Sequence, residues 1–172
     1  EAVRDVREGV EAFTFLLEKT ELKSASERLS EAFAVGEFLP EIRLLPREKK
    51  RQVLDFTRKA NQLLSALEVK DFERAGSLVR DLEGMSRDFD SAKPMAAIET
   101  ARTVSALHLA KARAAATSGD RVTLETELRT ATEIWPRNPA LAEVSGAIFT
   151  QTDVQQQALN DFERLHAQKN YR

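Results

Sequence analysis

The stretch from Ser118 to Pro139 constrains the fold of this chain more than any other. It opens on a Ser-Gly-Asp turn and closes on Trp-Pro-Arg-Asn-Pro, and glycine and proline are the strongest local breaks in a sequence. Asn138 before Pro139 is a helix start, because the amide side chain accepts a backbone N–H and proline lacks one to leave unpaired. Between these signals the apolar residues follow one face of an α-helix, at Leu124, Leu128, Ala131 and Trp135. The stretch therefore predicts a helix of about 121–134 and the start of another at 139.

The same helical period recurs along the rest of the chain. It predicts further helices at about 2–18, one through Leu22 that ends near Gly36, 47–68, one after Asp71 whose stripe reaches Leu82, 94–117, 139–150 and 153–169. Ser24 with Glu27, or else Thr20, begins the second of these, Asp71 caps the fourth, and Thr152 with Gln155 forms a capping box for the last. Residues 37–46 are predicted as a loop or short turn, and residues 87–93 as a connection. No strand-like alternation occurs, so we expect an all-α protein of about eight helices.

Composition excludes several classes of protein. Basic residues number 26 and acidic residues 28, so no global field recruits nucleic acid or an anionic membrane. The apolar runs are far shorter than the ~20 residues that span a bilayer. Cysteine is absent, which excludes disulfides, thiolate metal sites and thiol nucleophiles. Because the sequence begins at Glu1 without Met, we expect a processed or excised piece of a longer protein, either cytoplasmic or bacterial periplasmic.

The helices pair across short turns, and two of these turns suggest a repeat. From Asp120 to Asp153 is 33 residues, close to the ~34 of a tetratricopeptide unit. Residues 105–168 resemble two tandem tetratricopeptide repeats, and 56–88 resembles a degenerate third. The residues that carry the resemblance are the small, aromatic and closing positions Ala112, Gly146, Phe149, Ala158, Phe162, Ala131 and Pro136. Within one continuous domain we expect an N-terminal hairpin at 1–45, a degenerate repeat at 46–93 and two repeats at 94–172.

Hairpins of this kind bury their apolar surface by stacking on their neighbours, which predicts an α-solenoid, although a compact helical bundle stays open. The resemblance implies a concave groove that binds a peptide or partner helix. Carried over residue by residue, it places at the groove Leu109, Arg113, Ala116, Thr117, Glu143, Ala147, Thr150 and Gln151.

Catalytic and metal-binding motifs were sought among the polar residues. The chain has two histidines, His108 and His166, and Glu163 precedes the second at the spacing of di-iron bundles. Ser105 stands where a second copy would need its glutamate, so the set of ligands is incomplete. No nucleophile elbow, P-loop or HExxH occurs. We therefore expect no enzyme activity, no metal and no cofactor, and we interpret Trp135 as a core residue.

One local cluster is strongly basic. Arg47, Lys49, Lys50 and Arg51 stand at the expected start of a helix, where cations oppose the macrodipole. The cluster is either a solvated helix face or a site for an acidic partner. Without interleaved aromatic residues it does not favour nucleic acid.

The sequence thus predicts a non-catalytic protein-interaction module whose partner is another protein or peptide, with no nucleic acid and no direct membrane insertion. Two alternatives stay open: a structural segment of a bacterial secretion or pilus machine, and a metal-binding helical bundle.

Overall fold

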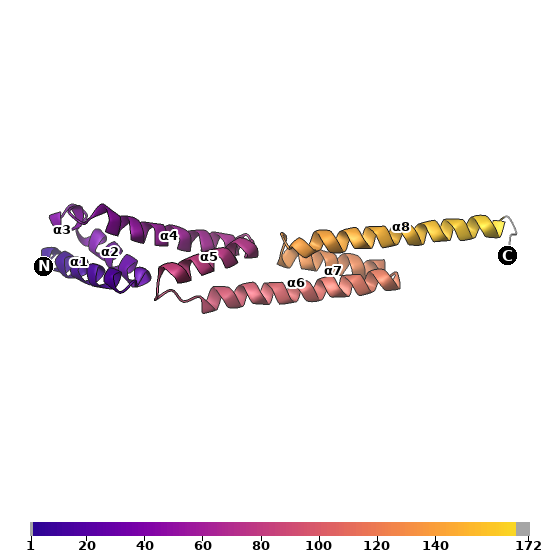
Figure 1. The fold of residues 1–172 in the computed structure, drawn as a ribbon, viewed down its shortest axis with the longest axis horizontal. Helices are drawn as coiled ribbons and strands as arrows, with labels where there is room; N and C mark the ends of the chain where they lie inside the picture. Colours follow the sequence, from indigo (N-terminus) through magenta and orange to yellow (C-terminus); the bar gives the residue numbers. More distant parts are fainter. Residues whose placement is uncertain (1, 168–172) are drawn as a thin grey trace. The chain divides into compact units, whose positions relative to one another are not determined.

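The computed structural model describes residues 2–167, apart from the side chains of residues 2, 149, 151, 152, 155 and 167. Helices account for nearly all of this range, and it contains no strand, so the predicted all-α class is confirmed (Figure 1). The chain divides into two compact units, Glu1–Ile98 and Glu99–Arg172.

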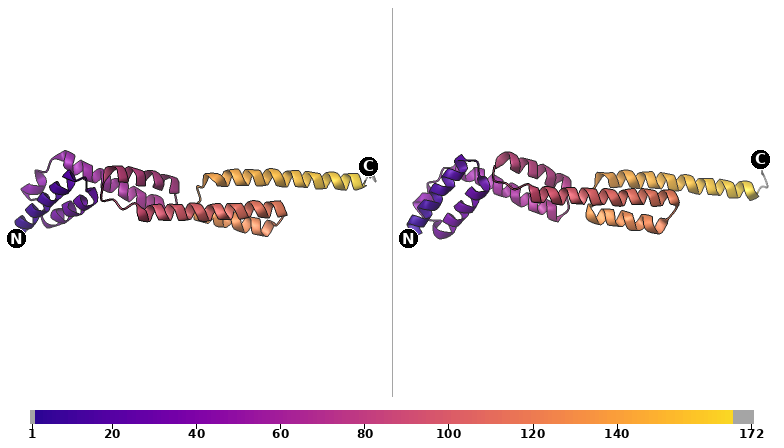
Figure 2. Two further views of the ribbon diagram at one scale, coloured as in Figure 1. Left: turned by 60° about the horizontal axis from the view of Figure 1, so that its bottom comes forward. Right: turned by 90° about the horizontal axis from the view of Figure 1, so that it is seen from below.

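The first unit begins with two helical hairpins. It contains α1 (Ala2–Glu18), α2 (Leu22–Gly36), α3 (Pro40–Arg43), α4 (Arg47–Glu68) and α5 (Phe72–Met85). The predicted bounds agree with α1 and α4 at both ends, with the end of α2 and with the start of α5, and α3 is a single turn inside the predicted loop. Figures 1 and 2 show α1 beside α2 and α4 beside α5.

The predicted stripes supply most of the core of this unit. Residues from each helix are buried, among them Val6, Phe13, Ala25, Ala32, Ile42, Phe56, Leu63, Ala75, Val79 and Leu82. Val3 of α1 and Phe33 of α2 follow the same helical period as the buried residues, but they are 49% and 50% exposed.

The same tight turn joins the two helices of three hairpins. Its central residue has a positive φ each time: 61° at Thr20, 57° at Lys70 and 76° at Gly119. The next residue donates its backbone N–H to a carbonyl five positions back, at distances of 2.9, 2.8 and 3.0 Å, in the pairs Glu21–Leu16, Asp71–Ala66 and Asp120–Ala115. This is the Schellman ending of a helix. Matched turns lie 50 and 49 residues apart, not 33.

Two of these turns also cap the helix that follows. Asp71 accepts the backbone N–H of Arg74 at 3.3 Å, as predicted from the sequence. Asp120 accepts the N–H of Thr123 at 3.1 Å and its hydroxyl at 2.6 Å. These contacts satisfy backbone donors that the first turn of a helix otherwise leaves unpaired.

The start of α2 is held differently from the prediction. Glu21 occupies the cap position and makes no side-chain cap, so the expected capping by Ser24 with Glu27 or by Thr20 is wrong. The buried Ser86 accepts the N–H of Leu22 at 2.8 Å. Asp88 accepts the N–H groups of Lys23 and Ser24 at 3.1 and 2.7 Å. The connection after α5 therefore caps a helix more than 60 residues earlier.

The second unit is built on α6 (Ala92–Ser118), α7 (Arg121–Ile134) and α8 (Pro139–Ala167). The first of these begins two residues before the predicted start at 94, and α7 agrees with its prediction. One side chain from α6, one from α7 and two from α8 form the core cluster Leu109, Ala131, Val144 and Ile148. Trp135 is 7% exposed, as expected for a core residue, and Arg102 lies 5.9 Å from the centre of its ring.

A buried polar chain fastens the start of α8. Asn138 accepts the N–H of Ala140 at 3.0 Å, which confirms the predicted cap. Its amide nitrogen donates to the hydroxyl of Ser105 at 2.9 Å, and that hydroxyl lies 3.5 Å from the carbonyl oxygen of Ala131. Side chains of α6 and the α7–α8 connection are thereby joined in a site that excludes water, where an unmet hydrogen bond is costly.

The two predicted helices at 139–150 and 153–169 are wrong, because α8 continues through residues 152–153. No glycine or proline lies between Ala147 and Ala167 to break the helix. The hydroxyl of Thr150 donates to the carbonyl of Gly146 at 3.0 Å, a bond made within the same helix. The turn that a second tetratricopeptide unit would place there is consequently missing. The side chains of Thr152 and Gln155, which were predicted to form the capping box, lie outside the described residues.

Candidate protein-binding surfaces

A groove was predicted between the first helices of two repeats, but its main apolar residue is buried in the core. Leu109 is only 4% exposed and packs with Ala131, Val144 and Ile148 in the core of the second unit. It therefore cannot contact a partner, and its assignment to the groove is wrong. Ala116 is partly buried against the same cluster.

The two charged groups of the predicted groove face each other. The guanidinium of Arg113 on α6 lies 3.6 Å from the carboxylate of Glu143 on α8. Both side chains are more than half exposed, and exposed pairs of this kind contribute only ~0–1 kcal/mol. Their charges are partly neutralised, so this site offers a partner little electrostatic selectivity.

Among the remaining predicted groove residues, the two threonine hydroxyls are described and are bonded within their own helices. The hydroxyls of Thr117 and Thr150 donate to carbonyls of their own helices, at 3.0 Å each. Ala147 is exposed, and the side chain of Gln151 lies outside the description. Gly146, expected at a close helix contact, has no atom within 4 Å of the place a Cβ would take.

The histidines make contacts within the second unit. Nδ1 of His108 lies 2.5 Å from the Glu127 carboxylate, and both side chains are about one-fifth exposed, so the pair joins α6 to α7. The exposed ring of His166 lies 6.1 Å from that of Phe162. Among residues 2–167, no three His, Cys, Asp or Glu side chains that are described gather as metal ligands do.

An apolar groove, which we name the α2–α4 groove, lies in the first unit. It has a volume of about 430 Å³ and is lined by Leu29, Ser30, Phe33, Ala34, Ile42, Lys50 and Leu54. Ile42 is 2% exposed, whereas Phe33 and Leu54 are 50% and 61% exposed. Large apolar side chains that stay this exposed around one hollow are typical of interaction sites.

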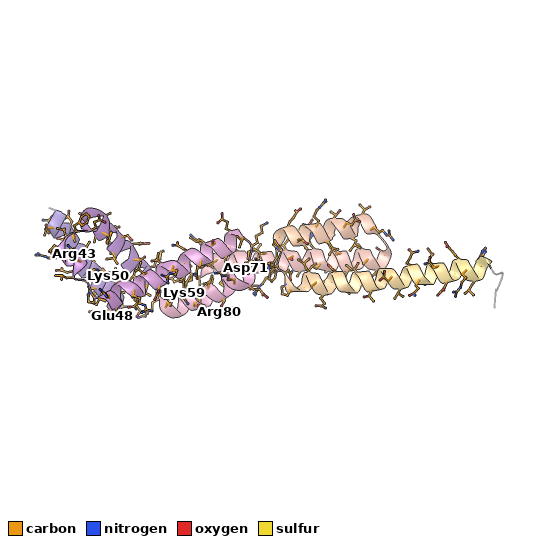
Figure 3. All side chains as sticks on the ribbon, turned by 90° about the horizontal axis from the view of Figure 1, so that it is seen from above. Arg43, Glu48, Lys50, Lys59, Asp71 and Arg80 are labelled. Carbon is orange, nitrogen blue, oxygen red and sulfur yellow. The ribbon has the colours of Figure 1, made fainter. Side chains whose placement is uncertain are left out.

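One residue of the predicted basic cluster, Lys50, belongs to the lining of this groove. Lys50 lines it and donates to the carbonyl of Arg43 at 3.4 Å (Figure 3). From Arg43 to Arg51 there are five basic residues and one acidic residue, which gives a local charge of +4. Arg51 pairs with Asp55 at 3.8 Å. Arg43, Arg47 and Lys49 form no ion pair with the described acidic side chains.

The basic cluster was predicted from the sequence, but the groove beside it was not. The missed signal was the run of residues 37–46, where aliphatic and aromatic residues alternate with prolines and leave Phe38 and Leu44 about 80% exposed. This bulky apolar stretch directly before a basic helix start was predicted only as a loop or short turn.

A second apolar surface lies on the carboxyl-terminal half of α8. Every side chain described from Asp153 to His166 is exposed. The predicted stripe there consists of Val154, Ala158, Phe162 and Leu165, of which the three large residues are 60%, 66% and 44% exposed. Figures 1 and 2 show this half of α8 extending beyond the turn between α6 and α7.

None of the described helices combines the length and apolar character that a bilayer crossing requires. Comparison with protein-family models, with curated proteins and with solved structures finds no match to this chain.

Proposed function

We propose that this protein is a non-catalytic interaction module that binds a helix of a partner protein along the exposed half of α8. One observation carries the proposal. The 3–4 series of α8 that contains the core residues Val144 and Ile148 runs through two glutamines to a second apolar group, Ala158, Phe162 and Leu165. A helix pair needs such a series on each member.

Exposure of this apolar face to water is unfavourable, so its burial against a partner would stabilise a complex. Full burial of a Leu or Phe side chain stabilises a complex by ~1.5–3 kcal/mol. Phe162 and Leu165 are largely exposed, so a helix packed on them removes much apolar surface from water. The amphipathic pattern selects a helical partner because its residues recur at helical spacing.

The proposed module keeps the stacked hairpins of a tetratricopeptide array but has a longer repeat. Within the first unit, α2 packs against both α1 and α4, so two hairpins adjoin. The recurring turn supports a stacked unit of about 50 residues in place of the 33 expected. On this proposal the exposed half of α8 is the first helix of a pair that a partner completes.

The test is a comparison of captured proteins. Wild-type protein and the variant Phe162→Ser with Leu165→Ser are used as baits in extracts of the source cells, with quantification by mass spectrometry. The matched control is Gln157→Ser with Asn160→Ser, which changes exposed polar residues of the same helix. We expect proteins retained by wild type and control to be lost from the apolar variant. Equal capture by all three baits would refute the role of this face.

A further inference from the structure

We propose that the α2–α4 groove binds an acidic peptide segment that inserts one aliphatic or aromatic side chain between Phe33 and Leu54. This site belongs to the first unit and does not depend on the α8 surface. Three features support this site: the shape of the groove, the nearby cations that form no ion pair with described acidic residues, and an open stretch of α4 that adjoins the groove.

The groove has the size and the lining of a side-chain pocket. Its volume of about 430 Å³ lies within the ~300–1,000 Å³ range of ligand pockets. Its apolar lining comes from α2, α3 and α4, and Ser30 and Lys50 are its polar members. A large apolar side chain fits this lining, while Lys50 is placed to meet an acidic group beside it.

Charge selects the chemistry of the partner. Arg43, Arg47 and Lys49 form no ion pair with the described acidic residues. Lys50 donates to the backbone carbonyl of Arg43 and likewise forms no ion pair with a described acidic residue. The amino end of α4 adds positive potential, because Pro46 provides no side-chain cap for its free N–H groups. An acidic segment would meet these cations, whereas a basic segment would be repelled by them.

The acidic residues of the neighbourhood do not already fill this role. Glu41 pairs with Arg7 at 3.3 Å. Asp55 lies 3.8 Å from Arg51 and 3.7 Å from Arg58. Glu48 is exposed and is the single acidic residue between Arg43 and Arg51, so residues 43–51 carry a net charge of +4 before the contact of Arg51 with Asp55 is counted.

An open stretch of the surface of α4 adjoins the groove at Leu54. Its other residues all belong to the same helix face of α4: Thr57, Arg58, Asn61, Gln62 and Ser65. From Lys50 to Ser65 the helix rises by ~22 Å, at ~1.5 Å per residue. This length suits an extended segment of about seven residues. A short peptide can therefore contact the cations and the apolar pocket together.

An anionic membrane is the competing occupant, because Phe38 and Leu44 are exposed beside the same cations. The groove favours the peptide, since a hollow of about 430 Å³ accepts a single projecting side chain. A lipid surface would use the outermost apolar residues and leave the groove unused. The test includes both.

The probe is a fluorescein-labelled peptide of about ten residues with a central Leu-Trp flanked by Glu and Asp, measured by fluorescence anisotropy at low and at physiological salt. Two further peptides replace the acidic residues by Lys, or Leu-Trp by Ser-Ser. Two groove variants are compared with wild type: Arg43→Glu with Lys50→Glu, and Phe33→Ser. The matched control, Lys111→Glu with Arg129→Glu, reverses two exposed cations of the second unit. Circular dichroism checks that each variant is folded.

We expect each groove variant to bind the acidic peptide at least tenfold more weakly, roughly a 1.4 kcal/mol loss, with less than a twofold change in the control. The Lys peptide and the Ser-Ser peptide should bind at least tenfold more weakly to wild type. Equal binding of acidic and Lys peptides, or unchanged binding by the groove variants, would overturn the proposal. So would a lack of peptide binding together with co-sedimentation of wild type with phosphatidylserine-containing vesicles.

Discussion

Replacing Asp88 by alanine should loosen the amino end of α2 although Asp88 lies outside that helix. Its carboxylate accepts the N–H groups of Lys23 and Ser24 at 3.1 and 2.7 Å, and the hydroxyl of Ser86 at 2.5 Å. Loss of a helix cap costs ~0.5–2 kcal/mol, and a hydrogen bond to a charged group contributes ~1.5–3 kcal/mol. Because Asp88 is only partly buried, we expect a total near 2 kcal/mol. That corresponds to a fall in Tm of about 4–8 °C for a chain of this size.

The effect should depend on pH in a defined direction. Burial alone would raise the pKa of Asp88, but the hydrogen bonds from Ser86, Ser24 and Lys23 outweigh it and bring the pKa below its ordinary 3.8. A lowered pKa means that the carboxylate stabilises the fold above its unfolded pKa of ~3.9 and loses this effect as pH falls through the folded pKa. The stability difference between wild type and Asp88→Asn should therefore be constant from about pH 5 to 8 and shrink below about pH 4.

Hydrogen exchange measures this prediction at the residues concerned. In Asp88→Ala the amides of Lys23 and Ser24 should lose protection because their acceptor is gone, and that of Leu22 because its acceptor, Ser86, loses its contact with Asp88. Urea unfolding followed by circular dichroism measures the global effect. Asp90→Ala is the matched control, because Asp90 accepts the N–H of Ala92 at 3.1 Å and caps a different helix. Wild-type protection of the three amides in Asp88→Ala would refute the assigned role of the carboxylate.

Three further substitutions test the packing. Ser105→Ala should destabilise the second unit by ~1–3 kcal/mol in urea unfolding, because it leaves the buried amide nitrogen of Asn138 without that partner; no change would exclude a stabilising role for this bond. Gly146→Ala should stabilise α8 by ~0.5–1 kcal/mol, since a Cβ there meets no atom within 4 Å. Gly36→Ala should destabilise by ~1–3 kcal/mol, because its Cβ would lie 2.5 Å from Cδ1 of Leu39 and 3.0 Å from Cγ2 of Val6, which is fully buried and has no room to move. Shifts of the same sign in the two glycine variants would contradict this contrast.

Local signals predicted the helices well where a turn follows directly in sequence. The period of apolar residues and the caps at Asp71 and Asp120 lie within a few positions of the helix ends that they determine. Such signals act through neighbouring backbone groups, so they can be recognised without knowing the tertiary fold.

Three predictions failed where the deciding contact is distant or where a signal has two meanings. Thr152 and Gln155 have the spacing of a capping box, but both residues also fit a helix interior, and no break forces the chain to turn. The cap of α2 comes from Ser86 and Asp88, which only the packed hairpins bring to it. Leu109 was assigned to a groove by analogy, whereas the continuous α8 covers it.

The α2–α4 groove could not be predicted either, because it needs side chains from three helices. The basic residues from Arg47 to Arg51 were visible in the sequence. The apolar hollow beside them depends on how α3 positions Ile42 between α2 and α4. A cluster of charge is a property of the sequence, but a pocket is a property of the packing.

The buried position of Trp135 supplies an optical probe of half of the molecule. It is the only tryptophan of the chain and lies in the unit Glu99–Arg172. The fluorescence of Trp135, excited selectively, should change when its ring leaves the core. Far-ultraviolet circular dichroism instead averages over the helices of both units. Superimposable denaturation curves from the two signals would identify the chain as one cooperative block, and separated midpoints would reveal two.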